Sequence, residues 1–397
     1  MNQTRRVCIL GGQRIPFAKS FTTYAHKTNQ ELMTAALSAL VQKFNLKGQR
    51  LGDVALGSVI KNSSDWNLAR ECVLGSGLDA HTPGYDVQRA CGTSLETAWQ
   101  IGLKIGAGQI DVGIAGGSDT NSDLPVMLPR RFGRLLLDAR SQKSIGGKLR
   151  VFSGLRPHHL KLQFPGVVEP RTGLSMGQHC ELMVKEWKIS RESQDELSYV
   201  SHQNAAKAYA EGFYSDQVAD YEGMKKDNLT RADTTREKLA KLKPAFDFTG
   251  AGTLTAGNST PLTDGAAAVL LASENFAQSK NIPVLAYLKD VEVAAVDFVN
   301  GGEGLLMAPT IAVSRLLERN QMKLQDFEFY EIHEAFAGQV LCTLKAWESK
   351  DYCEKRIGRK DALGSLDRSK MNVKGGSVAL GHPFAATGAR IIMTLAK

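Results

Sequence analysis

The sequence predicts an α/β protein in which a central sheet is covered by helices on both faces. Short apolar runs bounded by glycine alternate with longer segments whose apolar residues recur at helical spacing. The chain of 397 residues is long enough for two or three domains. Its apolar fraction of 43% and its charged fraction of 23% are ordinary for a globular protein.

The first third of the chain carries most of these elements. Residues 7–10 form an apolar run that ends in a Gly-Gly turn, which predicts a buried strand. Residues 29–44 place their apolar side chains on one face of a helix. A strand is expected at 54–60, a helix at 95–105 that stops at glycines, and another strand at 112–115. Strands that alternate with helices in this way favour a sheet between helical layers.

Residues 122–250 differ in composition, and we interpret them as a large insertion lying over the core. Two helices are expected there, near 177–187 and 191–210, and apolar sequence typical of a strand returns at 266–271. Basic residues are concentrated in the first part of the insertion, where Asp138 is the only acid: Arg130, Arg131, Arg134, Arg140, Lys143, Lys148, Arg150, Arg156 and Lys161.

The C-terminal part repeats the N-terminal plan weakly. The segment Leu51-Gly-Asp-Val opens an expected strand, and Leu324-Gln-Asp-Phe is a candidate for the same role. A loop-to-helix turn follows in each half, at Cys91 and at Ala385. This similarity suggests an internal duplication without establishing one.

Charge and cysteine content limit the classes of partner. The formal net charge of +8 favours anionic partners. No basic run is interleaved with aromatic residues as a nucleic-acid groove requires, so we expect no nucleic-acid partner. The six cysteines show neither a C-x-x-C pair nor zinc-ligand spacing, so reduced thiols, a cytoplasmic location and no metal are expected. We expect no signal peptide in the polar start at residues 1–6, and the apolar run at 266–272 is too short for a membrane span.

Two segments contain candidate catalytic residues in unusual surroundings. Cys91 lies between the polar turn Gln88-Arg-Ala and the start of an apolar helix, where the helix N-terminus should favour a thiolate and lower the thiol pKa. A small buried core cysteine is the structural alternative. His382 lies in a glycine-rich segment that permits close backbone packing, and Pro383 fixes the chain directly after it.

Two further segments are weaker when taken alone. His333 lies at a strand-to-helix transition within Glu331-Ile-His-Glu-Ala-Phe-Ala. Asn258 opens the small polar loop Asn-Ser-Thr-Pro-Leu-Thr-Asp, which runs into the strand expected at 266–271. Such a loop lets an extended ligand approach the backbone, and it is also a common turn composition.

Together, these segments resemble the thiolase family. The resemblance runs from Arg14-Ile-Pro-Phe near the start of the chain to Arg390 near its end, with the blocks in the family's order. The His333, Asn258 and Gly-His382-Pro-Phe-Ala-Ala-Thr-Gly blocks are similar to the fatty-acid β-oxidation branch, the thiolase subunit of trifunctional complexes.

The resemblance implies a fold and its domain boundaries. It implies two similar halves of βαβαβαββ type with layered sheets and helices. The first half would span residues 1–283 and carry a loop domain inserted at about 122–250. The second half would span residues 284–397.

The resemblance also implies the catalytic roles. Cys91 would be the nucleophile that carries the acyl group as a thioester, and His382 would take its proton. His333 would help to hold the substrate thioester oxygen in an oxyanion hole. These roles suit the chemistry, because a thiolate is both a good nucleophile and a good leaving group, and a thioester enolate needs preorganised donors.

Residues for coenzyme A are implied in the same way. Arg231 matches a family position near the nucleotide part of coenzyme A, while Met176 and Thr260 match positions that line the pantetheine channel. Most family members have serine where Thr260 stands. No permanently bound cofactor is expected, and coenzyme A and acyl-CoA would be substrates.

The implied reaction is acyl transfer, in which 3-ketoacyl-CoA and CoA give acetyl-CoA and a shortened acyl-CoA. The resemblance also implies a homodimer or dimer of dimers and a hydratase/dehydrogenase partner subunit. The basic insertion, with apolar residues among its charges, is either a solvated face or a segment that docks on an acidic surface, namely a partner subunit or an anionic membrane in peripheral contact. Two alternatives remain open, a biosynthetic acetoacetyl-CoA thiolase and a catalytically impaired CoA-binding scaffold. A ketoacyl synthase is more distant, because the Asn258 and Gly-His-Pro blocks argue against it.

One departure from the family pattern concerns a second cysteine. Family members carry it after the His-Pro helix, where it serves as the acid/base. The sequence to Lys397 does not contain it, and Cys342 and Cys353 lie before His382 and are not plausible substitutes. We therefore expect the C-terminal catalytic segment to be absent, which is the origin of the scaffold alternative.

Overall fold

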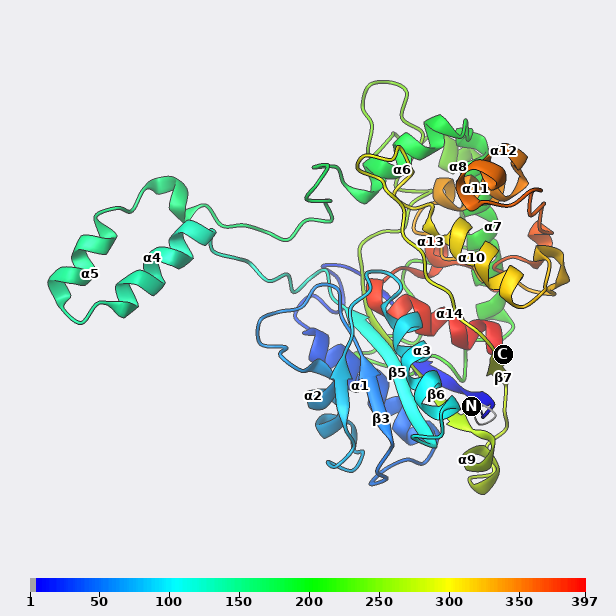
Figure 1. Cartoon of the computed structure of the whole chain (residues 1–397), viewed down its shortest axis with the longest axis horizontal. Coiled ribbons are helices and arrows are strands. Elements are labelled where there is room, and N and C mark those ends of the chain that lie inside the picture. The colour runs from blue at the N-terminus through cyan, green and yellow to red at the C-terminus, as the bar shows by residue number, and fades with distance from the viewer. Residues whose placement is uncertain (1–4) are drawn as a thin grey trace.

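A mixed β-sheet forms the centre of the computed structural model, which describes residues 5–397 (Figure 1). Residues 1–4, the start of both the expected first half and the polar segment at 1–6, lie outside the described residues. Within the described chain the sheet has the order β4-β3-β5-β6-β1-β7, and β2 pairs with β6 off this path. The strands are β1 (Val7–Arg14), β2 (Ala18–Lys19), β3 (Asp53–Leu56), β4 (Gly84–Asp86), β5 (Val112–Asp119), β6 (Thr263–Ser273) and β7 (Ala286–Leu288).

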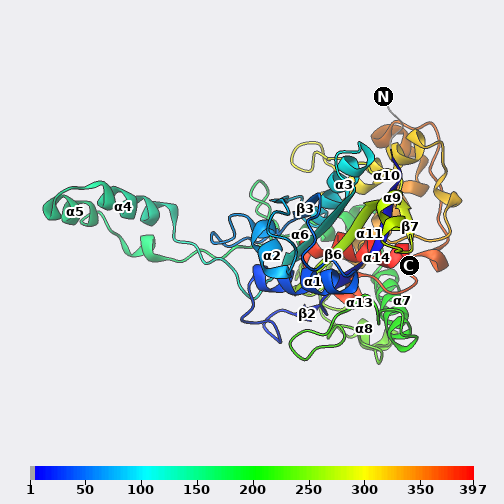
Figure 2. The same cartoon turned by 90° about the horizontal axis from the view of Figure 1, so that it is seen from below.

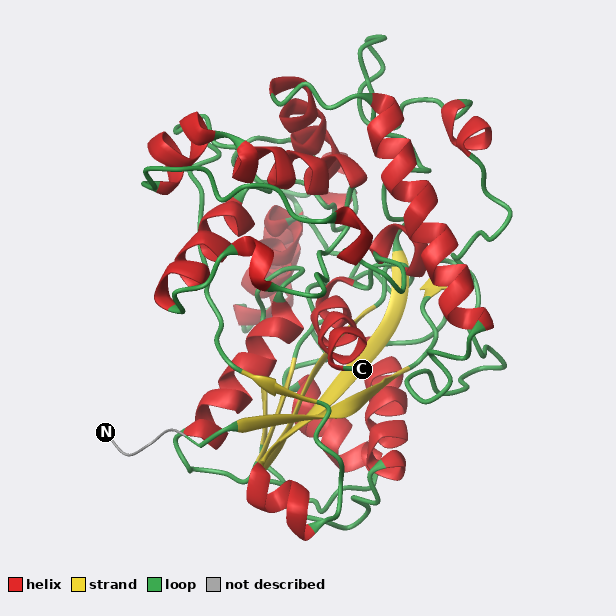
Figure 3. Ribbon diagram, turned by 90° about the vertical axis from the view of Figure 1, so that its right-hand side faces the viewer, coloured by secondary structure: helices red, strands yellow, loops and turns green. Residues whose placement is uncertain are grey.

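Helices cover both faces of this sheet, as the sequence predicts (Figure 3). The helices α1 (Asn29–Lys43) and α2 (Leu68–Ser76) share one apolar cluster with one face of the strands. The helices α3 (Thr93–Gly106) and α14 (Thr387–Ala396) share a second cluster with the other face. The α/β prediction is therefore confirmed, and the start of α3 lies next to α14, although nearly three hundred residues separate them in sequence.

Two close backbone contacts fix the turn before α14 against the sheet and α3. A Cβ atom on Gly117 would lie 2.5 Å from the carbonyl oxygen of Ala385, and one on Gly388 would lie 2.6 Å from the amide nitrogen of Leu95. Only glycine permits such approaches. The loop that contains His382 is thereby held near the N-terminal end of α3.

A second, mainly helical layer contains most of the C-terminal half. Its apolar clusters join α6 and α7 from the insertion to α11, so residues 176–210 are part of this layer. The remaining helices, apart from those between 130 and 160, are α6 (Met176–Glu186), α7 (Arg191–Ala210), α8 (Arg236–Ala240), α9 (Glu274–Ser279), α10 (Ala308–Arg319), α11 (Ala337–Glu348), α12 (Lys350–Tyr352) and α13 (Ser377–Leu380), with short 3-10 or π turns at Leu324–Asp326, Cys353–Ile357, Arg368–Lys370 and Phe384–Ala386.

The C-terminal half differs from the N-terminal half in its strands. Within the described residues it contributes only β7 to the regular sheet, and Tyr330 and Met371 form an isolated parallel bridge. The strand considered at Leu324 is a 3-10 turn instead. Asp326 accepts a hydrogen bond from the backbone of Lys323 at 2.8 Å, and such local bonds favour turns over strands.

The first part of the insertion does not lie over the core, which corrects that interpretation. The helices α4 (Arg130–Ser141) and α5 (Ile145–Phe152), followed by a turn at Pro157–Leu160, project away from the body as a hairpin (Figures 1 and 2). In α4 only Ala139 is buried, and α5 buries no residue. The hairpin therefore lacks the apolar contacts that hold the other helices to the core.

A buried ion pair connects the sheet to the helical layer. Both Nη atoms of Arg14, at the end of β1, donate to the carboxylate of Asp227, at 2.6 and 2.8 Å, and both side chains are fully buried. Tyr209 of α7 donates to the same carboxylate at 2.7 Å. The neighbouring carboxylate raises the pKa of Arg14 despite the opposing effect of burial, so the guanidinium stays charged.

We predict that Asp227→Asn destabilises the chain by ~3–5 kcal/mol, because it leaves the Arg14 charge buried without compensation. The matched control is Asp111→Asn, which breaks the exposed pair with Arg5 and should cost less than ~1 kcal/mol. Urea denaturation followed by circular dichroism measures both. Equal stabilities for the two variants would show that the buried pair does not stabilise the fold.

Candidate active site

Cys91 lies on a strained turn directly before α3. The preceding residue, Ala90, has φ +42°, a left-handed conformation that is costly for alanine. The hydroxyl of Thr93 accepts from the backbone of Arg89 at 2.9 Å and donates to the carbonyl of Ala90 at 2.7 Å. These bonds hold the turn, and strain of this kind is concentrated at functional sites.

His382 lies in the loop between α13 and α14. Its backbone N–H donates to the Thr263 hydroxyl at 3.2 Å, and its neighbour Ala385 donates to the buried carboxylate of Asp119 at 2.8 Å. The ring atom Nδ1 lies 2.6 Å from the hydroxyl of Thr387, the first residue of α14. The Thr387 hydroxyl therefore holds the ring at Nδ1, and Nε2 is available for another contact.

His333 lies in an extended segment before α11. The amide side chain of Asn372 bonds both backbone groups of Ile332, at 2.8 and 2.9 Å, which fixes the chain next to His333. On the other side, the Thr260 amide donates to the carbonyl of Ala335 at 2.9 Å. The Asn258 block thus supports the His333 segment from the end of the loop that runs into β6.

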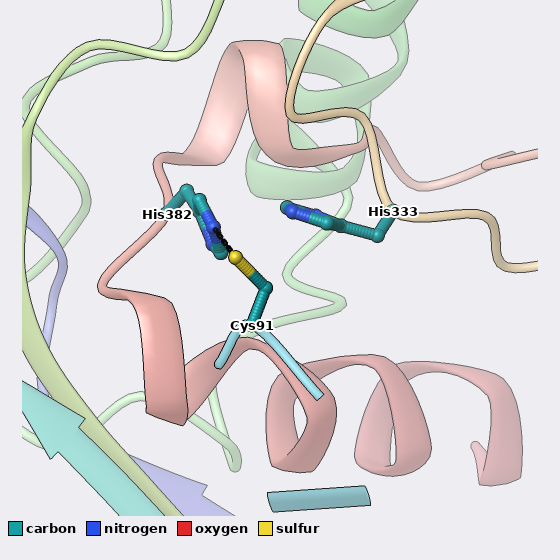
Figure 4. A group of neighbouring side chains, drawn as sticks. All are labelled: Cys91, His333 and His382. Atoms are coloured by element: carbon teal, nitrogen blue, oxygen red, sulfur yellow. Dashed lines mark hydrogen bonds between the residues drawn. The ribbon is translucent and has the colours of Figure 1, made fainter. Parts of the chain in front are cut away.

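The fold brings these three side chains together, as Figure 4 shows. Nε2 of His382 lies 3.1 Å from Sγ of Cys91, and the two histidine rings have centroids 4.1 Å apart. One donor atom from each of Cys91, His333 and His382 lies within 4.8 Å of the others. A thiolate and two imidazoles are also ligand types that zinc accepts, but the Cys91–His382 hydrogen bond gives these atoms a role without a metal.

The surrounding protein keeps both Cys91 and His382 uncharged. For Cys91 this contradicts the sequence prediction, which was a lowered thiol pKa. Surrounding protein raises the pKa of the Cys91 thiol to about 12, with the nearby Asp119 carboxylate as a lesser cause. Burial lowers the pKa of His382 well below its usual value, with smaller contributions from His333 and Arg390. Desolvation therefore exceeds the effect of the helix N-terminus, and the resting site holds a thiol beside an uncharged imidazole.

His333 is uncharged for the same reason. Burial, aided by the Arg390 cation, lowers the pKa of His333 to about 3. Its Nδ1 lies 2.8 Å from the Ser377 hydroxyl, whereas its Nε2 is buried without a hydrogen-bond partner among the described residues. An unpaired buried nitrogen beside a nucleophile can serve a substrate atom.

Sequence reasoning missed the residues that support the two histidines. Ser377 and Thr387 lie within the glycine-rich segment around His382, residues 375–390, but a hydroxyl in a motif has no signal of its own until its partner is known. Asn372 precedes that segment and gave no signal. Arg390 marked the end of the resemblance, and its buried bond to Glu331 at 3.1 Å became visible only in the structure.

The three residues expected to contact coenzyme A lie apart from one another. Arg231 lines a cavity of about 260 Å³ that Lys19, Lys238 and Pro261 also border. Thr260 directly precedes Pro261. Met176, the first residue of α6, packs instead against the apolar cluster that joins α6 to α11 and does not line this cavity.

Comparisons with known proteins agree with this geometry. The model of the thiolase N-terminal domain matches residues 7–275, and that of the thiolase C-terminal domain matches residues 282–397. The 3-ketoacyl-CoA thiolases of Yersinia pestis (strain Pestoides F) and of Yersinia pseudotuberculosis serotype O:3 (strain YPIII) are each 41% identical over 98% of this chain and 90% of their own length.

Two solved structures share the fold. The Bacillus anthracis acetyl-CoA acetyltransferase superposes with a TM-score of 0.81 at 30% identity, covering 100% of this chain and 92% of that one. Human mitochondrial 3-ketoacyl-CoA thiolase in complex with CoA gives a TM-score of 0.79 at 27% identity, covering 99% and 91%.

The expectation that a C-terminal catalytic segment is absent finds no support in these matches, because both thiolase domain models match the chain. The scaffold alternative thereby loses the observation that motivated it. The strained Cys91 turn, the Cys91–His382 contact and both domain matches lead to one conclusion: this chain belongs to the thiolase family.

Proposed function

We propose that this chain is an acetyl-CoA C-acyltransferase that cleaves 3-ketoacyl-CoA with CoA, and that Cys91 carries the acyl group. The observation that carries the proposal is the 3.1 Å contact between the Cys91 thiol and His382 Nε2. A neutral imidazole at this distance can accept the thiol proton during attack, so no thiolate is needed in the resting enzyme.

The reaction follows from this pair. The thiol proton passes to His382 Nε2 as Sγ bonds to the 3-keto carbon, whose oxygen takes up the negative charge. When the carbonyl reforms, the bond to the neighbouring α-carbon breaks, and the acetyl-CoA enolate that leaves takes up the proton held by His382. The thiol of CoA then attacks the Cys91 thioester and gives its proton to His382, and the Cys91 sulfur leaves and takes that proton back.

His333 is proposed to stabilise the negative charge on the substrate thioester oxygen through its buried Nε2. A neutral imidazole donates one hydrogen bond without bringing a charge that would stabilise a resting Cys91 thiolate. Donors of this kind, preorganised by the fold, are each typically worth ~2.7–4 kcal/mol in the transition state.

We also propose that the cavity beside Arg231 receives the phosphate-bearing part of coenzyme A. Among the described residues, Lys19 and Arg231 have no carboxylate within salt-bridge distance, so their charges are available to an anion. Thr260 precedes Pro261 at the border of this cavity and would contact the pantetheine arm. Met176 lies outside this cavity, against the cluster between α6 and α11, and is not part of the proposed coenzyme A site.

A biosynthetic acetoacetyl-CoA thiolase is the main competing function. The 41% identity to 3-ketoacyl-CoA thiolases over 98% of the chain favours the degradative reaction. Identity to the two solved structures does not separate the functions, at 30% for the acetyltransferase and 27% for the 3-ketoacyl-CoA thiolase. Assays with 3-ketoacyl-CoA substrates of increasing chain length distinguish the two. Activity that collapses for every substrate longer than acetoacetyl-CoA would establish the biosynthetic alternative.

Assembly and location are proposed from the edge of the sheet, the resemblance and the cysteines. The edge strand β4 has an unpaired outer side, and Trp66, close before the neighbouring α2, is 89% exposed, which favours a homodimer or dimer of dimers through this edge. A hydratase/dehydrogenase partner follows from the branch that the motifs resemble. The free state of all six cysteines supports a cytoplasmic location. No helix among residues 5–397 has the length and apolar character needed to cross a bilayer.

The projecting hairpin is proposed to bind an anionic membrane surface. Its helices expose large apolar side chains, including Leu137 at 60%, Ile145 at 79% and Leu149 at 67%, beside the basic cluster from Arg130 to Lys161. Apolar and cationic groups on the same short helices suit the interface between lipid headgroups and acyl chains.

The first prediction from the proposed function concerns thiol reactivity. Iodoacetamide should alkylate Cys91 in the folded chain and leave the other five cysteines intact, because only Cys91 is exposed. Acyl-CoA should protect it. Peptide mass spectrometry after short exposure measures the labelling. Equal labelling of Cys91 and the buried cysteines, or labelling that acyl-CoA does not slow, would remove Cys91 from the proposed role.

The second prediction concerns the base. His382→Ala should slow acylation of Cys91 by ~100-fold or more, the usual scale for a positioned base. Because the thiol pKa is raised to about 12, the residual rate should increase as pH rises and more thiolate forms. Stopped-flow acylation across the pH range measures this, with His179→Ala, a buried histidine outside the site, as control. Unchanged acylation in His382→Ala refutes the pairing.

The third prediction concerns the hairpin. The chain should sediment with anionic vesicles at low salt and not with neutral vesicles, and binding should weaken as salt screens the charges. Replacing Arg130, Arg131 and Arg134 with glutamate should abolish sedimentation without changing Cys91 alkylation. A matched control places glutamate at Lys207, Lys280 and Lys360, which are exposed elsewhere. Loss of binding in the control as well, or binding of the wild type only to a hydratase/dehydrogenase subunit, contradicts the membrane proposal.

A further inference from the structure

A buried hydroxyl separates His333 from a buried cation. The Oγ atom of Ser377 lies 2.8 Å from Nδ1 of His333 and 2.8 Å from Nη2 of Arg390. Ser377 is fully buried, and the Arg390 side chain is 1% exposed. The three groups form a short chain that ends at Glu331, which accepts from Arg390 at 3.1 Å.

The hydrogens in this chain can be assigned from donor and acceptor capacity. A guanidinium has only donors, so Arg390 must donate to the Ser377 oxygen. If Nδ1 of His333 also donated, the hydroxyl hydrogen would be buried without an acceptor, because no other side-chain partner of Ser377 Oγ occurs among the described residues. Buried polar hydrogens are nearly always bonded, so the hydroxyl donates to Nδ1.

This assignment fixes the tautomer of the second histidine. With Nδ1 as acceptor, the ring hydrogen of neutral His333 lies on Nε2, the atom that is buried and unpaired. Figure 4 shows the His333 ring directed toward His382 and Cys91. An Nε2–H group in this place can donate to a substrate oxygen, whereas the other tautomer would present a lone pair and repel it.

We propose that Ser377 is a positioning residue that sets His333 in its Nε2–H tautomer, with Arg390 orienting the Ser377 hydroxyl. The inference deepens the proposed function and rests on it for its kinetic part only. Ser377 does not touch the reacting atoms, and its contribution passes entirely through the His333 ring.

The reaction requires the two histidines in opposite tautomers. His382 accepts the Cys91 proton at Nε2 only when its own hydrogen lies on Nδ1, beside the Thr387 hydroxyl, and that contact admits either direction of donation. His333 must donate from Nε2, so it needs a hydroxyl that donates to Nδ1. Arg390 contacts the hydroxyl behind His333, and no such cation bonds Thr387 among the described residues.

The ion pair with Glu331 allows the Arg390 guanidinium to be buried. The Arg390–Glu331 pair is almost fully buried, at 1% and 4% exposure, and burial raises the pKa of Glu331 to about 7 even though Arg390 opposes the shift. The neighbouring Glu334 bonds Ser201 and Asn372 instead, at 2.8 and 2.6 Å. The positive charge is therefore compensated locally while its second Nη group remains directed at Ser377.

The test combines NMR with kinetics. In the wild-type chain carrying isotope-labelled histidine, two-bond nitrogen–proton spectra should show His333 protonated on Nε2 and unprotonated on Nδ1, with His333→Gln used to assign the signal. Ser377→Ala should yield a mixture of tautomers and lower kcat by ~10-fold or more with KM nearly unchanged, somewhat less than the loss of a whole oxyanion donor. Ser377→Thr, which keeps the hydroxyl, should restore both the tautomer and kcat.

Ser198→Ala is the matched control, because it removes another buried hydroxyl, in α7, without touching either histidine. His333 protonated on Nδ1 in the wild type overturns the proposal, and so does a Ser377→Ala variant with unchanged tautomer and kcat. If Ser377→Ala fails to fold, the wild-type and Ser377→Thr spectra decide alone. A wild-type chain without thiolysis would end the proposed function, while the resting-state spectra would still test the tautomer.

Discussion

The close approach of backbone segments around Gly117 and Gly388 is the constraint on which the catalytic arrangement depends. Cys91 and His382 are carried by loops that are nearly three hundred residues apart, and their contact requires α14 and its preceding turn to lie against β5 and α3. A methyl group at either glycine would separate these layers by more than a hydrogen bond can tolerate. Small residues in the sheet and in α14 are therefore what allows Cys91 and His382 to meet.

Burial then determines the charge states. The same close packing that joins the two loops removes water, and the loss of solvation raises the thiol pKa and lowers both imidazole pKa values. The sequence interpretation considered only the helix N-terminus, which would favour a thiolate. A helix terminus is worth at most about 2 kcal/mol near its end, and desolvation by the protein around the thiol exceeds that. The resting pair of Cys91 and His382 therefore carries no charge.

Local pattern was enough to predict α1, α3, β5 and β6, because their residues carry clear periodicity and glycine boundaries, whereas α2, β2 and β4 were not predicted. The residues Cys91, His333 and His382 could be selected because they stand in distinctive blocks. The residues that support these side chains could not be selected, since the roles of Ser377, Thr387 and Asn372 depend on partners distant in sequence. The prediction that the insertion lies over the core was wrong, because composition does not reveal whether an amphipathic helix has a partner. The strand considered at Leu324 was also wrong, because Asp326 forms a local hydrogen bond that favours a turn.

The separation of the α4–α5 hairpin from the core has an evolutionary consequence. Since the hairpin shares almost no apolar contacts with the body, its sequence and length can drift at little cost to the stability of the catalytic layers, because closing a longer loop costs only slowly increasing entropy. Selection on the active site and selection on this segment are thereby uncoupled. The surface that the hairpin presents can therefore be rewritten while the distance between Cys91 and His382 stays the same.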